Sequence, residues 1–579
     1  RSHALPPPLA MTSPSSALLL SRFSRRILLS TSTSSTSLPS RRPFTTKTNE
    51  GNERRASIGL GGATALGIAL YVGSTRRTRK AEADASAHPA IAPSDPNFQV
   101  PARKDLPVYR REEVKKHGKQ AERMWVTYKM GVYDITEFVE SHPGGDKILM
   151  AAGGAVDPFW ALYAQHKTDD VMEVLEGLRI GSLDPTEPPP VQTVDASDPF
   201  STDPPRHPAL IVNNAKPFNA ETPPSLLIDN FRTPNDLFFV RNHLPVPKVD
   251  AATHRLHIDG LGVNKEVDLS LDELKKKYKE HYVTSVVQCG GNRRADMQRF
   301  KKVAGLMWEG YAISNAKWTG VRLRDVLIDL GVDPNDERIK HVHLQGADVD
   351  PTGKAYAASI PFEKAMSPEV LLAYKMNDED IPLDHGFPLR CVVPGVVGAR
   401  QVKWVTAIHL DEEESSSHFQ QKDYRVFSPG VQHGDELNWK AVPSIQDYPV
   451  QSAFCLPANG SVVDREDGTV DVAGYAWSGG GKAIIRVEVS PDGGKTWYSA
   501  DMEQDPEQSW DKMWAWTLFR ASIPIPEGAK TMDLVVKATD RSYNTQPETA
   551  AGIWNIRGLL HNAWHHVEVK IRDEQDKDL

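Results

Sequence analysis

The segment Val283-Thr-Ser-Val-Val-Gln-Cys-Gly-Gly-Asn-Arg-Arg294 joins a β-rich run to a cysteine, two glycines and two arginines. The run of β-branched residues predicts a strand that ends just before Cys289. Two neighbouring arginines create a positive field that favours the thiolate, which is the form of cysteine that binds soft metals. The segment therefore predicts a metal-binding thiolate at the end of a strand.

Three further stretches combine basic side chains with turn residues. They are Phe239-Val-Arg-Asn-His243, His385-Gly-Phe-Pro-Leu-Arg390 and Gly395-Val-Val-Gly-Ala-Arg-Gln-Val-Lys-Trp404. Glycine permits a close approach of the backbone to a ligand, and Arg, His and Lys suit a phosphate. None of the three is a Walker loop or a G-x-G-x-x-G fingerprint, so nucleotide binding gains no support.

A second cofactor site is predicted from His142-Pro-Gly-Gly145 and His166. The Pro-Gly-Gly turn lets His142 project from a loop. Two imidazoles on opposite faces of a haem iron fill both axial positions, so such a haem transfers electrons and does not bind oxygen. The alternative is a histidine in an ordinary Pro-Gly turn together with an unrelated helical histidine.

The residues around these histidines are strongly acidic. Between Asp134 and Glu176 there are nine acidic residues, against Lys147 and Lys167. An acidic surface near a haem edge suits a basic electron-transfer partner through electrostatic steering. The alternative interpretation is a surface whose charges serve only solvation.

Length and composition restrict the class of protein. The chain has 579 residues, of which 39% are hydrophobic and 25% charged, with three cysteines and a net charge of −8. These values predict several domains and exclude a collagen-like chain, a polytopic membrane protein and a disulfide-held scaffold. The net charge gives no support for nucleic-acid binding. Cys391 and Cys455 match no ligand motif and are interpreted as small buried apolar residues.

The first eighty residues differ from the rest, because they hold 13 Lys or Arg and 2 Asp or Glu. A basic, Ser-rich and acid-poor composition predicts a mitochondrial transit peptide over residues 1–55. Residues 56–73 are uncharged between basic flanks, and eighteen helical residues span about 27 Å. They predict a hydrophobic sorting segment or a transmembrane anchor, as in bipartite signals for the mitochondrial intermembrane space. A disordered tail is the alternative.

The remaining chain divides into a linker, three domains and a hinge. The linker is predicted over 74–100 and a compact haem-binding domain over 101–184. Residues 185–206 are rich in proline, which favours an extended and semi-rigid hinge. Helical and strand signals mix over 207–425, whereas 426–579 contains short alternating strands that predict a β-sandwich. The predicted fold class is therefore a multidomain α+β protein.

Local signals add detail to the last two domains. Ser270-Leu-Asp-Glu273 is a capping box that predicts the start of a helix, and Val321–Leu330 has helical spacing before Gly331. Ile484–Ser490 alternates and leads into a glycine turn, which predicts a hairpin. A further strand is predicted over Leu534–Thr539.

These motifs carry a resemblance to two known families. Residues 101–184 resemble cytochrome b5, and the central motifs resemble the molybdopterin domain of the sulfite oxidase family. Haem domain, proline-rich hinge, mixed α/β cofactor domain and immunoglobulin-like β-sandwich follow one another over 101–579 in the animal-type order. One departure is visible, because the family usually has Cys-Ala-Gly-Asn-Arg-Arg and Gly290 here replaces the alanine.

The resemblance implies the roles of particular residues. Cys289 would be the single protein ligand of molybdenum, and His142 and His166 would bind the haem iron. The molybdopterin cofactor would be held by Val240, Arg241, Asn242, His243, Asp348, His385, Arg390, Gln401, Val402 and Lys403. Arg241, Arg294 and Arg557 would bind the anionic substrate, with Trp308 and Tyr424 as aromatic residues of its pocket.

The resemblance also implies an activity. Sulfite would be oxidised to sulfate at the molybdenum–molybdopterin centre, and electrons would pass one at a time through haem b to cytochrome c in the mitochondrial intermembrane space. The C-terminal domain would form a homodimer, and 56–73 is a candidate tether to the inner membrane.

Three alternatives to this activity remain. They are a nitrate reductase-like molybdoenzyme, a haem electron carrier with an inactive molybdopterin domain, and a structural mitochondrial protein. Nitrate reductases place the haem after the molybdenum domain, whereas the predicted haem domain comes first here. The complete arginine set and Cys289 argue against an inactive domain.

Overall fold

The structure is a computed structural model that describes Val100, Arg103, 105–142, 145–162, His166, 169–187, 198–201, 203–350 and 352–573. The predicted transit peptide, the apolar segment 56–73 and nearly all of the linker 74–100 lie outside these residues, as does part of the hinge 185–206. Within the described part of the chain, no helix combines the length and apolar character needed to cross a bilayer.

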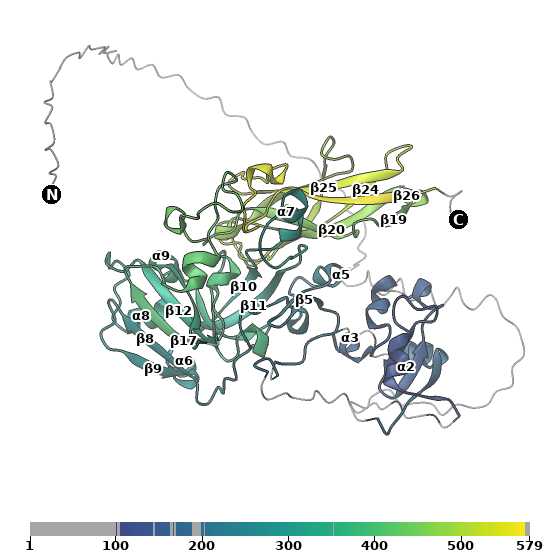
Figure 1. Ribbon diagram of the computed structural model, residues 1–579, viewed down its shortest axis with the longest axis horizontal. Helices are drawn as coiled ribbons and strands as arrows, with labels where there is room; N and C mark the ends of the chain where they lie inside the picture. The colour runs from purple at the N-terminus through teal and green to yellow at the C-terminus, as the bar shows by residue number, and fades with distance from the viewer. Residues whose placement is uncertain are drawn as a thin grey trace, which may run out of the picture. The chain divides into compact units, whose positions relative to one another are not determined.

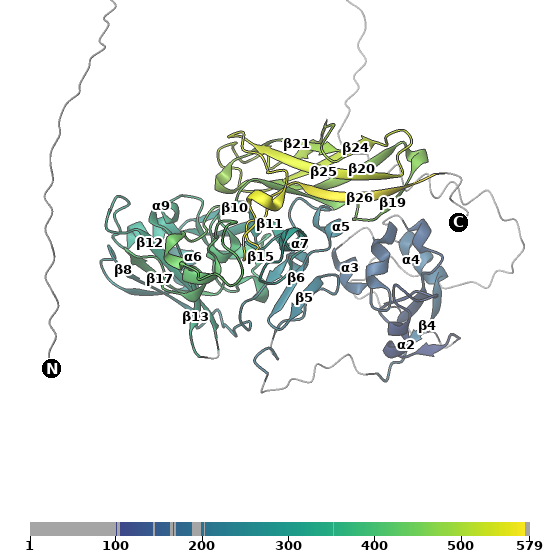
Figure 2. The ribbon, with the colours of Figure 1, turned by 45° about the horizontal axis from the view of Figure 1, so that its top comes forward.

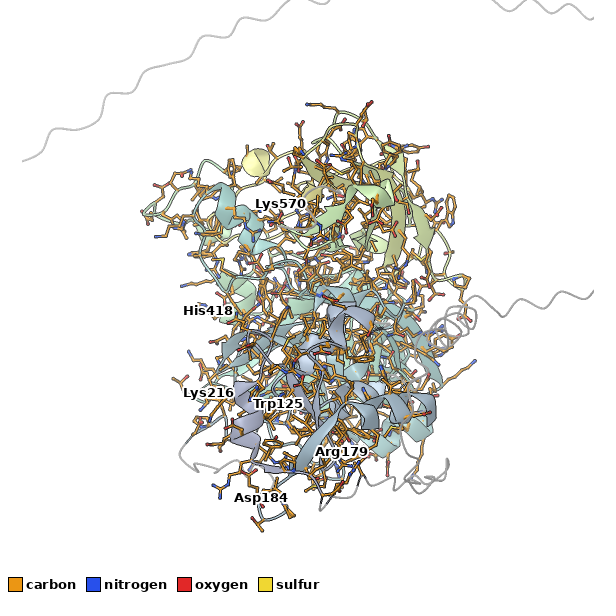
Figure 3. All side chains as sticks on the ribbon, turned by 90° about the vertical axis from the view of Figure 1, so that its right-hand side faces the viewer. Trp125, Arg179, Asp184, Lys216, His418 and Lys570 are labelled. Atoms are coloured by element: carbon orange, nitrogen blue, oxygen red, sulfur yellow. The ribbon has the colours of Figure 1, made fainter. Side chains whose placement is uncertain are left out.

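A small sheet of four strands, in the order β1-β4-β3-β2, organises the first described domain, which is blue in Figure 1. Trp125 on β2 and Arg179 on β4 belong to this sheet (Figure 3). Tyr133 and Ile135 are fully buried in the core beneath it. The elements are β1 (Val108–Tyr109), α2 (Arg111–Lys116), β2 (Trp125–Tyr128), β3 (Gly131–Asp134), α3 (Asp157–Leu162), α4 (Asp169–Gly177) and β4 (Arg179–Leu183).

Three sheets form the central domain, in the orders β5-β6-β7, β10-β11-β14-β15 and β13-β12-β17-β8-β9, with β16 paired to β14. Strands β10 and β11 are antiparallel, and their pairing ends where Gln288 meets Ile313. This register confirms the predicted strand and places Cys289 in the loop that follows it. The strands are β5 (Ile211–Ala215), β6 (Phe218–Glu221), β7 (Val240–Arg241), β8 (Arg255–Gly260), β9 (Val267–Ser270), β10 (Glu280–Gln288), β11 (Ile313–Arg322), β12 (His341–Val349), β13 (Ala355–Pro361), β14 (Leu371–Met376), β15 (Glu379–Asp380), β16 (Arg390–Val392) and β17 (Val405–Asp411).

Short helices cover the ends of these sheets. The predicted capping box is confirmed, because the Glu273 N–H donates to the Ser270 hydroxyl and the Glu273 carboxylate accepts from the Ser270 N–H. The helical prediction for Val321–Leu330 is wrong at its start, since Val321 pairs with Leu372 inside β11. The helices are α5 (Pro224–Leu227), α6 (Leu271–Lys277), α7 (Arg294–Phe300), α8 (Leu323–Asp329) and α9 (Phe362–Ala365).

Two facing sheets, in the orders β18-β20-β24-β23 and β19-β26-β25-β21-β22, form the C-terminal sandwich. The paired strands β20 and β24 of one sheet and the paired strands β25 and β26 of the other lie in the yellow-green part of Figure 2. Val470 and Phe519 of one sheet pack with Val536 and Val569 of the other in a common core. The strands are β18 (Gln451–Leu456), β19 (Val462–Asp464), β20 (Thr469–Trp477), β21 (Ile484–Ser490), β22 (Tyr498–Ser499), β23 (Asp501–Glu503), β24 (Thr517–Pro524), β25 (Thr531–Asp540) and β26 (His565–Arg572).

The loop after β10 is fastened to the sandwich by hydrogen bonds. The Arg293 guanidinium is fully buried and donates to the carbonyl oxygens of Ala563 (2.6 Å) and Ser452 (3.2 Å). The Asn292 amide donates to the Tyr475 hydroxyl at 2.9 Å. The motif that predicted a metal ligand therefore also joins the central domain to the sandwich.

Three buried histidines should make the fold sensitive to acid. Burial lowers the pKa of His385, His561 and His565 to about 3. Unfolded histidine titrates near pH 6.5, so below that pH the unfolded chain binds protons that the folded chain does not. The free energy of unfolding should therefore fall by about 1.4 kcal/mol per pH unit for each histidine between roughly pH 6 and 4. When the free energy of unfolding, measured by urea titration, is plotted against pH over this range, His561→Gln should show a shallower slope than the wild type. An unchanged slope would contradict the prediction.

Candidate functional site

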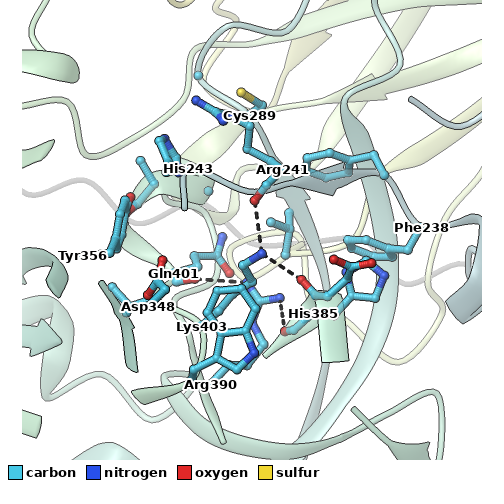
Figure 4. Close-up of a pocket in the computed structure, with 18 of the residues that line it drawn as sticks. Phe238, Arg241, His243, Cys289, Asp348, Tyr356, His385, Arg390, Gln401 and Lys403 are labelled. Carbon is cyan, nitrogen blue, oxygen red and sulfur yellow. Dashed lines mark hydrogen bonds between the residues drawn. The ribbon is translucent and has the colours of Figure 1, made fainter. Parts of the chain in front are cut away.

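A pocket with about 660 Å³ of empty volume, partly open to solvent, lies in the central domain (Figure 4). Most of the residues predicted for the cofactor and substrate site are on its wall, namely Arg241, His243, Cys289, Asp348, His385, Arg390, Gln401, Val402, Lys403 and Tyr424. The wall is completed by Phe238, Phe239, Val287, Gly290, Tyr356, Asp384, Gly398, Ala399 and Trp404.

Cys289 is held at the pocket wall by its backbone. Its N–H donates to the carbonyl oxygen of Ala312 at 3.0 Å, and its own carbonyl oxygen accepts from the Asn292 N–H (2.9 Å) and the Tyr448 hydroxyl (3.1 Å). The side chain is buried in an apolar cluster that includes Trp308. Among the described residues that line the pocket, Cys289 is the one cysteine. A soft metal bound there would therefore have a single thiolate from the protein and would take its other ligands from a cofactor.

The two glycines after Cys289 have different roles. A Cβ on Gly290 would lie 3.2 Å from Val397, which a small shift accommodates. A Cβ on Gly291 would lie 2.5 to 2.7 Å from the guanidinium atoms of Arg294. Gly291 therefore makes room for the arginine, whereas the glycine that departs from the family pattern is sterically optional.

Two of the predicted anion-binding arginines have neutral partners. The Arg241 Nη1 atom donates to the side-chain oxygen of Asn219 (3.0 Å) and to the carbonyl oxygen of Asn242 (2.6 Å). Arg294 is buried at the start of α7 and donates to carbonyl oxygens, among them that of Gly558 at 3.2 Å. Burial lowers the pKa of Arg294, and the nearby backbone dipoles solvate a charge that they do not neutralise.

Arg557 differs from these two arginines because it is ion-paired. Its Nη2 atom lies 2.9 Å from a carboxylate oxygen of Asp423, and its side chain is 30% exposed. The charge of Arg294 interacts with those of Cys289, Arg241 and Arg557, so the three arginines and the cysteine share one electrostatic neighbourhood. Within it, the uncompensated positive charge is concentrated on Arg241 and Arg294.

A polar network forms one side of the pocket around Lys403 (Figure 4). The Lys403 ammonium donates to the carbonyl oxygens of Arg241 (3.1 Å) and Asp384 (2.7 Å) and to the side-chain oxygen of Asn242. Burial lowers the pKa of Lys403 to about 7, although the Asp384 charge opposes the shift. The Asp384 carboxylate in turn pairs with the guanidinium of Arg206 at 2.7 and 2.9 Å.

The opposite charges of Asp348 and Arg390 complete the polar wall. Arg390 donates to the carbonyl oxygens of His385 (2.9 Å) and Gln401 (3.0 Å). Burial raises the pKa of Asp348 to about 6 and lowers that of Arg390 to about 10. Among the described residues, Asp348 Oδ1 and Arg390 Nε find no hydrogen-bond partner. Unpartnered buried polar atoms on a pocket wall fit a large polar ligand such as a pterin.

Tyr424 and His243 add a neutral polar pair to the wall. Tyr424 follows a π-helical turn, Phe419–Asp423, and its hydroxyl lies 2.7 Å from His243 Nε2 in a hydrogen bond. Burial raises the pKa of Tyr424 to about 12 and lowers that of His243 well below its usual value. Both side chains are therefore uncharged at neutral pH.

Five predicted residues lie off the pocket wall. Val240 packs in a small apolar cluster beside β7, and Asn242 bonds to the network around the wall. Trp308 is fully buried in the apolar cluster of Cys289. Arg294 interacts electrostatically with Cys289 and with Arg557, but neither arginine is part of the pocket wall.

In the first domain, His142 and His166 face each other with ring centroids 6.4 Å apart and ring planes 6° apart. A metal–imidazole bond is about 2 Å long and half a ring adds roughly 1 Å, so an iron between two such rings needs a separation of about 6 Å. Phe138 packs edge-on to His142, and Trp160 stacks on His166. The pair fits a haem iron with one imidazole on each side.

A buried carboxylate supports the loop 309–311 beside the site. Glu221 accepts hydrogen bonds from the N–H groups of Glu309 (3.1 Å), Gly310 (3.1 Å) and Tyr311 (2.8 Å), and from the amide of Asn213 (2.8 Å). Glu221→Ala would leave the buried Gly310 N–H and the half-buried Tyr311 N–H without this acceptor, so we expect a loss of about 3 kcal/mol or more of unfolding free energy. Urea unfolding measures this loss, and Glu221→Gln, which keeps an acceptor, should lose less. An alanine variant as stable as the wild type would contradict the assignment.

The chain matches three protein families along its length. Residues 110–184 match the cytochrome b5-like haem/steroid binding domain, residues 243–419 the oxidoreductase molybdopterin binding domain, and residues 442–572 the Mo-co oxidoreductase dimerisation domain. Together with the pocket and the paired histidines, these matches define a molybdopterin oxidoreductase that carries a haem domain.

Relatives narrow the class further. The chain is 50% identical to mouse mitochondrial sulfite oxidase over 467 residues, which cover 80% of this chain and 84% of the mouse protein. It is 48% identical to the Drosophila melanogaster protein of the same name, over 82% of each chain. The chain belongs to the sulfite oxidase family. Among solved structures, the sulfane dehydrogenase SoxCD from Paracoccus pantotrophus is similar with a TM-score of 0.51 and 26% identity, over 61% of this chain and 84% of that one.

Several residues of the site carry no sequence signal of their own. Asp384 adjoins the motif that begins at His385, and Trp404 is the last residue of the motif that begins at Gly395, so their position in the chain could have suggested them. Tyr356, Arg206 and Asn219 lie outside every motif and reach the site only through the fold.

Proposed function

We propose that the chain oxidises sulfite to sulfate, a reaction that consumes one water and releases two electrons and two protons. The observation that carries the proposal is Arg241, a pocket arginine with neutral partners on the same wall as Cys289, the predicted metal ligand. A guanidinium binds an oxyanion in a planar fork. The mouse and fly relatives are named sulfite oxidases, which supports this substrate.

Cys289 is the proposed protein ligand of molybdenum, with the pterin as the source of its other ligands. When bound, the molybdenum supplies oxygen-atom transfer and accepts the two electrons. Arg390 and Lys403 are the proposed partners of the pterin phosphate, and Asp348 offers its unpartnered oxygen to an N–H of the ring. The rest of the proposed pterin site consists of Val240, Arg241, Asn242, His243, His385, Gln401 and Val402.

Sulfite is proposed to bind against Arg241, with Arg294 and Arg557 behind it. Arg241 and Arg294 have no ion pair among the described residues, so they leave enough positive charge to bind a dianion and the more oxygen-rich state that resembles the product. The Tyr424 hydroxyl keeps its proton at neutral pH, because burial raises its pKa to about 12, so it is a donor for an anion oxygen. Trp308 packs behind Cys289 and limits the space around the thiolate.

His142 and His166 are the proposed axial ligands of haem b. Their parallel rings and their separation of 6.4 Å support this assignment. A haem held by both histidines would have no open position on its iron and would supply single-electron transfer. The acidic residues of this domain suit a basic acceptor, and we propose cytochrome c.

The chain is proposed to act as a homodimer in mitochondria. The match of residues 442–572 to a dimerisation domain supports the dimer, and the names of the mouse and fly relatives support the organelle. The basic N-terminal composition and the uncharged run 56–73 favour the intermembrane space, with that run as a candidate membrane tether.

The proposed function is tested by measuring the cofactor content of the purified protein and the ratio of cytochrome c reduced to sulfate formed. We expect molybdenum, pterin and haem in equal amounts per chain, and two molecules of cytochrome c reduced for each sulfate formed. Protein with a full set of cofactors that reduces nitrate and leaves sulfite unchanged would overturn the proposal in favour of a nitrate reductase-like enzyme. Protein with haem but an empty molybdenum site would favour the electron carrier.

A further inference from the structure

Asn219 lies beside the pocket arginine because of strand pairing. Strands β6 and β7 are antiparallel, and Asn219 is paired directly with Arg241. Side chains of paired residues point to the same face of a sheet and touch. The Asn219 side chain is 1% exposed, so its amide is a permanent part of the interior.

Three hydrogen bonds fix the orientation of this amide. Its oxygen accepts from Arg241 Nη1 at 3.0 Å and from the Asn242 N–H at 3.1 Å. Its nitrogen donates to the carbonyl oxygen of Pro217 at 2.8 Å. The oxygen has two donors and the nitrogen an acceptor, so the network allows one orientation of the amide, with the oxygen towards the guanidinium.

The partner of Arg241 is neutral, although a carboxylate of the same shape would bind a guanidinium more strongly. Among the described residues, no carboxylate lies within ion-pairing distance of Arg241, whereas Arg206 pairs with Asp203 and Asp384, and Arg557 pairs with Asp423. Asparagine therefore restrains the side chain without cancelling its charge. An aspartate would also accept from Arg241, although it lacks the N–H that donates to Pro217, and it would occupy the charge that a substrate anion needs.

We propose that Asn219 is a positioning residue that orients Arg241 towards the substrate anion and keeps its charge free. The inference rests on the proposed function, in which Arg241 binds sulfite. The inference adds one requirement to the proposed function: the residue paired with Arg241 must be a neutral hydrogen-bond acceptor. The effect belongs to anion binding, so it should appear in KM and in product affinity more than in kcat.

The decisive comparison is between Asn219→Asp and Asn219→Ala in the cofactor-loaded enzyme. The aspartate keeps the shape and the acceptor but adds a charge, and we expect KM for sulfite and Kd for sulfate to rise by about tenfold or more. The alanine removes the restraint and leaves the charge, so we expect a rise of only about threefold. In both variants kcat should stay within about threefold of the wild type.

Asn214→Ala is the matched control. The Asn214 amide donates to the carbonyl oxygens of Lys216 (3.1 Å) and Pro217 (3.0 Å) in the same hairpin, but it does not reach Arg241. The substitution Asn214→Ala removes a comparable support of the turn, but the KM for sulfite and the Kd for sulfate should remain at their wild-type values. Pterin content and thermal midpoint, measured for every variant, show that the site is intact.

The measured stability separates positioning from a structural role. If Asn219 only stabilised the hairpin, the loss of sulfate affinity would follow the loss of thermal midpoint in the two variants, and that pattern would overturn the inference. Wild-type affinity in an intact Asn219→Asp enzyme would overturn it as well, while leaving sulfite oxidation unaffected. If Asn219→Asp does not fold, an Asn219→Ala enzyme with unchanged sulfate affinity overturns the inference. Failure of the wild type to oxidise sulfite would instead reject the proposed function.

Discussion

Cys289→Ser is expected to abolish sulfite oxidation while the pterin remains bound. The substitution is nearly isosteric, and the backbone bonds that hold the residue to Ala312 and Tyr448 do not involve the sulfur. A serine hydroxyl is a hard, protonated group at neutral pH and a poor ligand for a metal that prefers a thiolate. We expect kcat to fall by at least about 1,000-fold, because the loss affects the reacting centre itself.

Turnover and cofactor content must be measured on the same sample. The pterin should stay near its wild-type amount, since Lys403, Arg390 and Asp348 are unchanged on the pocket wall. Cys455→Ala is the matched control, because Cys455 is equally buried but lies in β18 of the sandwich. It should keep its turnover, with only some loss of stability from the small cavity. Near-normal turnover of the serine variant would contradict Cys289 as the metal ligand.

His142→Ala is expected to separate the two halves of the reaction. Removing one ring of the parallel pair leaves the iron with one protein ligand, so we expect loss of haem from the first domain. Reduction of cytochrome c should fall by about 100-fold or more, since the proposed electron path to it runs through the haem. Sulfite oxidation with a small oxidant that reaches the molybdenum pocket directly should stay within about threefold of the wild type.

A histidine elsewhere in the same domain provides the control. His117 stacks on Trp125 with ring centroids 3.5 Å apart, its Nδ1 atom bonds to the carbonyl oxygen of Arg123, and its Nε2 atom lies 3.8 Å from a carboxylate oxygen of Glu113, so both ring nitrogens have protein partners. His117→Gln should keep its haem and its reaction with cytochrome c. If His142→Ala retains both, the haem ligands and the electron path have to be assigned elsewhere.

The parts of the site that could be predicted are those with a local signal. Cys289 follows a β-rich run and precedes two glycines and two arginines, all within one short segment. The strand before it is confirmed by the register of β10. Local spacing was less decisive for Val321, because an apolar residue at that position fits either a helix or the end of a buried strand. Its pairing with β14 decides for the strand.

The parts that could not be predicted depend on contacts between distant residues. Arg206 meets Asp384 across 178 positions of the chain, and Asn242 meets Asp384 across 142. Asn219 is only 22 positions from Arg241, but the contact exists because β6 and β7 pair in one particular register. Nothing in the local sequence distinguishes these polar residues from those that face solvent. Their burial and their partners follow from the tertiary fold.

Sulfite is proposed to be oxidised at the molybdenum pocket, with its electrons passing to the haem of the same protein. The decisive experiment is to add sulfite anaerobically to the oxidised, cofactor-loaded protein and to follow the absorbance of the haem. We expect prompt reduction of the haem by sulfite and none by nitrite. If the protein contains haem and molybdenum but its haem stays oxidised after sulfite is added, sulfite is not the substrate and the roles of Arg241, Arg294 and Arg557 have to be assigned again.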